Sequence, residues 1–130
     1  MQRRRLLREA VVLGAAAAAF GFSASGASAF SATFIWCSGS PRFELNDLPA
    51  GTVAVQFAMT DLNVPGFHHG GGKIAYNGQA EVPCGAFSAG FTGPSPPAGQ
   101  VHTYEFTVKA LGPAGAVLAT TTTRRKFPER

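Results

Sequence analysis

Two stretches in which large apolar residues alternate with small or polar ones limit what this chain can fold into. They run from Thr52 to Thr60 and from His102 to Ala110. The large apolar residues are Val53, Val55, Phe57 and Met59 in the first stretch, and Tyr104, Phe106 and Val108 in the second. A period of two residues is typical of a strand with one buried face, because successive side chains point to opposite sides of a sheet. The sequence therefore predicts antiparallel β-structure.

Glycine and proline make up 22 of the 101 residues from Phe30 onward, a density that leaves little room for helices. A turn at Gly112–Gly115 predicts a hairpin between the second alternating stretch and the segment that follows. Further strands are predicted at Thr33–Cys37, Arg42–Leu45, Lys73–Tyr76, Ala86–Phe91 and Ala116–Thr123. We expect one all-β domain, a compact antiparallel β-sandwich of six to eight strands over residues 30–130, with a core of Phe34, Trp36, Leu45, Val53, Val55, Phe57, Phe91, Tyr104, Phe106 and Val108.

Residues 1–29 have the pattern of an export signal. Four arginines precede the apolar run Val11–Phe22, and an Ala-x-Ala sequence ends at Ala29. The arginine-rich start resembles the twin-arginine export signal, although general secretory export remains an alternative. The apolar run is shorter than the roughly 20 residues that a membrane-spanning helix needs. We therefore expect a periplasmic or secreted protein without a transmembrane segment in its mature form.

The distribution of charge argues against a nucleic-acid partner. The chain has 11 Lys and Arg against 7 Asp and Glu, but four of the arginines belong to the signal. The mature chain is thus almost neutral, and a basic surface of the kind that binds nucleic acid is not expected. The remaining basic cluster, Arg124–Lys126, lies next to the C-terminus and is interpreted as a solvated tail.

Cys37 and Cys84 are the two cysteines of the chain. An exported protein with two cysteines is expected to join them in a disulfide. The alternative is a thiolate site that binds a metal together with histidines.

A Gly-Pro-Ser-Pro-Pro loop at 93–97 is followed by His-Thr-Tyr at 102–104, at the start of a predicted strand that ends in Ala-Leu. This combination resembles the phosphatidylethanolamine-binding protein family, specifically its bacterial Raf-kinase-inhibitor-like branch, and it is the most specific similarity in the chain. Weaker similarities, in the same order as in the family, are found at Cys37–Pro41, Leu48–Thr52 and Asp61–Pro65. The resemblance implies a β-sandwich with a small anion-binding pocket at one end.

The resemblance also implies which residues line that pocket. They are Asp61, His69, Gly93, Pro94, Pro96, Pro97 and His102. Histidine can offer an N–H group or a positive charge to an oxyanion, while Asp61 would orient a histidine or bind an ammonium group. His68 and His69 are adjacent, so at most one of them is expected to face the pocket. The Gly70–Gly72 run is interpreted as a flexible loop.

The sequence therefore favours an exported binding protein for a small anion, such as phosphate or a phosphorylated head group, with no cofactor. Two alternatives remain open. One is a metal-binding protein that uses His68, His69 and His102, and the other is a protein-interaction or inhibitor module with an unidentified partner. No nucleophile motif or obvious catalytic triad is present, so an enzyme is not predicted.

Overall fold

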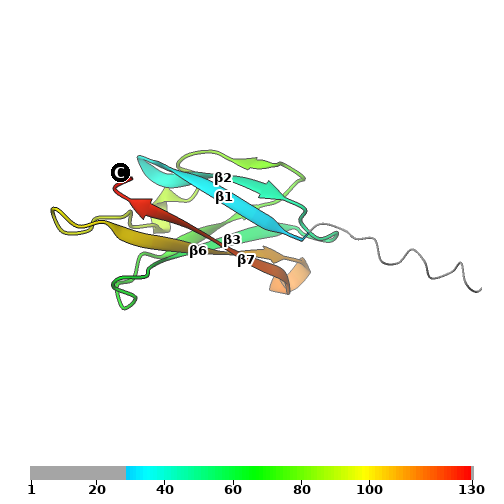
Figure 1. Cartoon of the computed structure of the whole chain (residues 1–130). Coiled ribbons are helices and arrows are strands. Elements are labelled where there is room, and N and C mark those ends of the chain that lie inside the picture. Colours follow the sequence, from blue (N-terminus) through cyan, green and yellow to red (C-terminus); the bar gives the residue numbers. More distant parts are fainter. Residues whose placement is uncertain (1–28, 130) are drawn as a thin grey trace, which may run out of the picture.

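The computed structural model describes residues 29–129, and the predicted export signal lies almost entirely outside them. Seven strands form two antiparallel sheets, which pack face to face as a sandwich (Figure 1). The three-stranded sheet has the order β1-β2-β5, with β1 at Ser31–Cys37, β2 at Gly39–Asn46 and β5 at Glu81–Val82. The four-stranded sheet has the order β4-β3-β6-β7, with β4 at Gly71–Ala75, β3 at Ala54–Asp61, β6 at His102–Leu111 and β7 at Val117–Phe127. The predicted all-β sandwich is confirmed at this level.

The two alternating stretches form the central pair of the four-stranded sheet. They are β3 and β6, and Phe57 lies opposite Val108 in their antiparallel register. Their inward side chains pack against Phe43 of β2, whose ring centroid lies 4.5 Å from that of Phe57 and 4.9 Å from that of Phe106. Val53 was expected in this core, but it precedes β3 and is 47 % exposed.

The sequence pattern is wrong for the segment after β5 and right for the segment after β6. The expected strand at Ala86–Phe91 is instead a series of turns around the short 3₁₀ helix η3, Ser88–Gly90. Phe87 alone of this segment is buried, because its ring stacks on Phe57. The expected hairpin is confirmed, since β6 pairs with β7 across the turn η4, Pro113–Gly115.

The C-terminal basic cluster is part of a strand and not a solvated tail. Strand β7 extends to Phe127, so Arg124, Arg125 and Lys126 alternate between the two sides of the sheet. Arg125 points towards β1, where its Nε donates a 2.8 Å hydrogen bond to the carbonyl oxygen of Phe34. In return, the Trp36 indole N–H donates a 2.8 Å hydrogen bond to the Lys126 carbonyl oxygen. These two bonds join the adjacent edges of the two sheets.

The Gly70–Gly72 run is also ordered structure and not a flexible loop, because Gly71 and Gly72 begin β4. A Cβ atom at Gly71 would collide with the backbone of Phe57, and one at Gly72 would collide with the side chain of Phe87. Glycine is required here because β4 approaches its neighbours closely.

The predicted disulfide between Cys37 and Cys84 is present, with Cα atoms 5.8 Å apart. It joins the end of β1 to the segment that follows β5.

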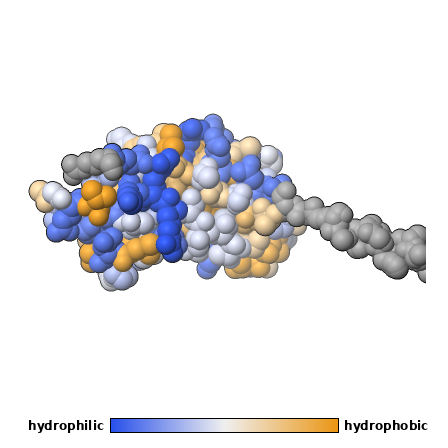
Figure 2. Space-filling model, in the orientation of Figure 1, coloured by the Kyte–Doolittle hydropathy of each residue, from blue (hydrophilic) through white to orange (hydrophobic). Residues whose placement is uncertain are grey.

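Among the described residues, no helix is long and apolar enough to cross a membrane. The surface in Figure 2 shows hydrophobic and hydrophilic residues side by side at the end of the molecule that carries the long loops.

Candidate functional site

A cavity of about 100 Å³ opens at the end of the sandwich where β3 ends and β6 begins. Five of the sequence-predicted site residues line it, namely Asp61, His69, Pro96, Pro97 and His102. The lining is completed by Val64, Phe67, Ser95 and Tyr104. A cavity of this volume accommodates a small ion or head group, because binding sites for drug-sized molecules are several times larger.

Asp61 ends β3 and organises the loop that follows. Its Oδ1 accepts hydrogen bonds from the backbone N–H groups of Asn63, at 2.8 Å, and Val64, at 3.2 Å. Its Oδ2 accepts a 2.7 Å hydrogen bond from Nδ1 of His102. Burial alone would raise the pKa of Asp61, but these hydrogen bonds outweigh burial and lower the pKa below its ordinary value of 3.8. Asp61 is therefore a buried carboxylate that orients its neighbours, and all its donors come from the protein.

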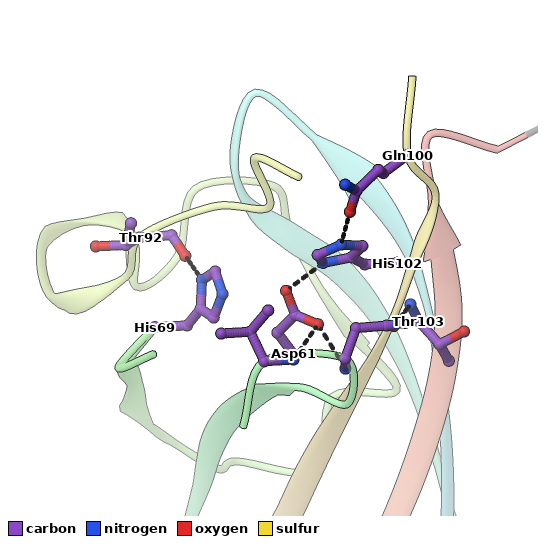
Figure 3. Close-up of polar contacts among 8 residues, drawn as sticks. Asp61, His69, Thr92, Gln100, His102 and Thr103 are labelled. Carbon is purple, nitrogen blue, oxygen red and sulfur yellow. Dashed lines mark hydrogen bonds and ion pairs between the residues drawn. The ribbon is translucent and has the colours of Figure 1, made fainter. Parts of the chain in front are cut away.

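His102 begins β6, and both of its ring nitrogens are occupied (Figure 3). Nδ1 contacts Asp61, and Nε2 lies 2.9 Å from Oε1 of Gln100. These two contacts fix the orientation of the His102 ring beside the Asp61 carboxylate.

His69 approaches the cavity from the loop before β4 and is only 4 % exposed. Its Nδ1 donates a hydrogen bond to the Thr92 carbonyl oxygen at 2.7 Å, so this nitrogen carries the hydrogen. No hydrogen bond to its Nε2 is found among residues 29–129. The ring packs against Phe67, with ring centroids 4.6 Å apart, and against Tyr104, at 5.5 Å. Figure 3 shows the two histidine rings on either side of Asp61. His68, by contrast, is exposed.

Tyr104 has the one buried side-chain polar atom without a hydrogen-bond partner among the described residues. The residue is 0 % exposed and is one of those that line the cavity. Its hydroxyl is close to the Asp61 carboxylate and the Ser95 backbone but makes a well-formed hydrogen bond with neither. Burial first, and then the negative charge of Asp61, raise the pKa of Tyr104 to about 12. The hydroxyl is thus a neutral donor at any physiological pH. A buried hydroxyl without a partner costs about 1–3 kcal/mol, so a group that binds in the cavity and accepts its hydrogen bond would recover that energy.

The proline-rich loop contributes fewer groups than the sequence suggested. Pro96 and Pro97 line the cavity with apolar surface, whereas Gly93 and Pro94 are not among the lining residues. Proline has no N–H group, so the loop offers its polar contact through Ser95. Ser95 was not predicted as a site residue, and neither was Tyr104. The alternation in β6 could have indicated Tyr104, because it lies two residues after His102 and therefore on the same face.

The structure does not assemble the three histidines into a metal site. No group of three or more His, Cys, Asp or Glu side chains that could hold a metal ion is found within residues 29–129. The cysteines are joined to each other, which leaves no thiolate for such a site. The chain matches no protein-family model, and it matches no curated protein.

Proposed function

We propose that this protein binds a small oxyanion, such as phosphate or the phosphate of a head group, in the cavity between His69 and His102. The observation that carries the proposal is the unpartnered, buried hydroxyl of Tyr104, a residue that lines the cavity. Buried polar groups without partners are rare in folded proteins, and a functional ligand is one explanation for such a group.

The other polar groups of the cavity support an oxyanion over a cation. The ring of His69 lines the cavity, and its Nδ1–H donates to the Thr92 carbonyl oxygen, which holds the ring in place. Both oxygens of Asp61 already accept hydrogen bonds from the protein, three in all, so this carboxylate is less available to a cation. Val64, Phe67 and the two prolines surround these groups with apolar surface, which strengthens a hydrogen bond to a charged ligand.

The disulfide and the export signal are consistent with a binding protein that works outside the cytoplasm. Membership of the phosphatidylethanolamine-binding family, in its bacterial Raf-kinase-inhibitor-like branch, is part of the proposal and rests on the sequence similarities alone. The proposal assigns no catalytic step to the site.

Calorimetric titration of the exported protein with phosphate, phosphoethanolamine and zinc tests the proposed function. We expect saturable binding of one or both phosphate compounds, because the Tyr104 hydroxyl is a buried donor without a partner. His69→Gln changes a ring that lines the cavity and should weaken binding, whereas His68→Gln, which changes an exposed neighbour, should not. Zinc binding without phosphate binding would favour the metal-binding alternative.

A further inference from the structure

Every lysine in the sequence lies on one surface of the sandwich. Lys73, Lys109 and Lys126 are the three lysines of the chain, and they belong to β4, β6 and β7. In the antiparallel register, Gln56 of β3 lies between Lys73 and Lys109, and Thr103 lies opposite Lys126. All three lysines alternate with inward-facing residues, so they project from the outer side of the four-stranded sheet. We call this surface the lysine face.

The side chains between the lysines are small or neutral. They are Gln56, Ala58, Thr60, Thr103, Thr107, Thr120 and Thr122. The one carboxylate on this surface belongs to Glu105, which is paired with Arg124 at 2.9 Å. The surface therefore carries three positive charges that no neighbouring acid balances.

The other cations of the described chain have acidic partners. Arg42 on the opposite sheet is paired with Glu81, and Arg125 is paired with Glu129. No ion pair involves a lysine within residues 29–129. The lysines, which have no acidic partner among the described residues, are thus concentrated on a single broad and regular surface.

An exposed apolar loop lies at the end of this surface. Leu62, Val64 and Phe67 are 36 %, 47 % and 51 % exposed. The backbone N–H of Leu62 donates a 2.8 Å hydrogen bond to the Thr103 carbonyl oxygen, which anchors the loop beside the strand pair that carries Lys126. Figure 1 shows the loop after β3 projecting on the side of the four-stranded sheet that faces away from β1 and β2. The apolar loop and the lysines can therefore meet the same partner.

We propose that the lysine face docks on an anionic phospholipid bilayer, with the Leu62–Phe67 loop entering the head-group region. Lysines spread over a broad surface match the dispersed negative charge of anionic head groups. Near an anionic membrane, each lysine strengthens binding about fivefold. Exposed aliphatic and aromatic side chains next to the cations favour a bilayer over an acidic protein or a polysaccharide, since only the bilayer offers an apolar layer beneath its charge. The loop shares Val64 and Phe67 with the cavity, but no lysine lines the cavity, so the charge contribution is separate from it.

Vesicle co-sedimentation tests this proposal on protein purified after export, with its N-terminus sequenced to confirm that Arg3–Arg8 are absent. We expect binding to vesicles of equal parts phosphatidylglycerol and phosphatidylcholine, and none to phosphatidylcholine alone. Lys109→Gln should weaken binding roughly fivefold, and the combined Lys73→Gln, Lys109→Gln and Lys126→Gln variant on the order of 100-fold. Arg42→Gln is the matched control, because it removes a positive charge from the opposite sheet, and it should change binding less than about twofold.

Two further variants separate the competing explanations. Phe67→Ser should weaken vesicle binding if the loop enters the head-group region. Tyr104→Phe should leave vesicle binding intact, because head-group capture in the cavity is not the source of the attachment. Equal binding to both kinds of vesicle, or an unchanged affinity in the triple lysine variant, would overturn the proposal. Binding to an anionic polysaccharide that is as tight as vesicle binding and insensitive to Phe67→Ser would overturn the choice of a bilayer.

Discussion

Replacing Tyr104 by phenylalanine should make the protein more stable and a poorer binder. The substitution keeps the ring, which packs against Trp36 at 5.6 Å between centroids and against His69 at 5.5 Å. It removes only the hydroxyl, which is fully buried and has no hydrogen-bond partner within residues 29–129. A buried polar group without a partner costs about 1–3 kcal/mol, so the free energy of unfolding should rise by a similar amount.

Thermal and urea unfolding of the ligand-free protein measure this change. For a domain of this size, 1 kcal/mol corresponds to a shift in Tm of roughly 4–8 °C, so an increase of at least about 4 °C is expected. Tyr76→Phe provides the control, because Tyr76 is the other tyrosine of the chain and is only partly buried, and its Tm should change little. A lower Tm for Tyr104→Phe would show that the hydroxyl is hydrogen-bonded in solution, and the reasoning that assigns it to a ligand would fail.

The same variant should bind phosphate less well than the wild type. A hydrogen bond from a neutral donor to a charged group contributes about 1.5–3 kcal/mol, which corresponds to a loss of roughly 10-fold to 100-fold in affinity. Stability and affinity thus change in opposite directions, which is expected when a binding group is kept at a cost to the ligand-free fold.

Three other predictions concern the scaffold of the site. Replacing Cys37 and Cys84 by alanine should lower the free energy of unfolding by about 4 kcal/mol, because the disulfide joins residues 47 apart, and urea unfolding measures the loss. Because the pKa of Asp61 is lower in the folded than in the unfolded protein, its carboxylate stabilises the fold, and this stabilisation is complete above about pH 4. The stabilisation is lost as the pH falls through the lowered pKa. Acid unfolding, monitored by circular dichroism, should therefore be less steep in Asp61→Asn. Gly72→Ala should cost about 1–3 kcal/mol, because its Cβ would collide with the Phe87 side chain, whereas Gly66→Ala, where the space is open, should be nearly neutral in the same unfolding assay.

The fold was predictable where the sequence alternates over a long stretch. Strands β3 and β6 were recognised because each buries every second side chain over eight residues or more. The short strand β5, Glu81–Val82, has no such pattern, since two residues cannot show a period. The segment Ala86–Phe91 looked like a strand because it contains two phenylalanines, but turns place both rings against the core, and the segment pairs with β-structure only through one bridge between Phe91 and Gly70.

The position of the site could be predicted from the sequence, but only some of its residues and none of its hydrogen bonds could. Asp61, His69 and His102 were named from the sequence, and the fold brings them to one cavity. The hydrogen bonds that occupy both nitrogens of His102 depend on where Gln100 lies after folding, and no local pattern encodes that position. The orphaned hydroxyl of Tyr104 is likewise a property of the folded core, because an alternating pattern identifies a buried ring and says nothing of its hydroxyl.

The most direct test of the central claim is a nuclear magnetic resonance titration of the isotope-labelled exported protein with inorganic phosphate. The account predicts saturable shifts at His69, Ser95, His102 and Tyr104, which line the cavity, and much weaker saturable shifts at the same residues in Tyr104→Phe. Absence of any saturable shift, or shifts confined to the lysine face, would contradict the claim that the cavity binds an oxyanion.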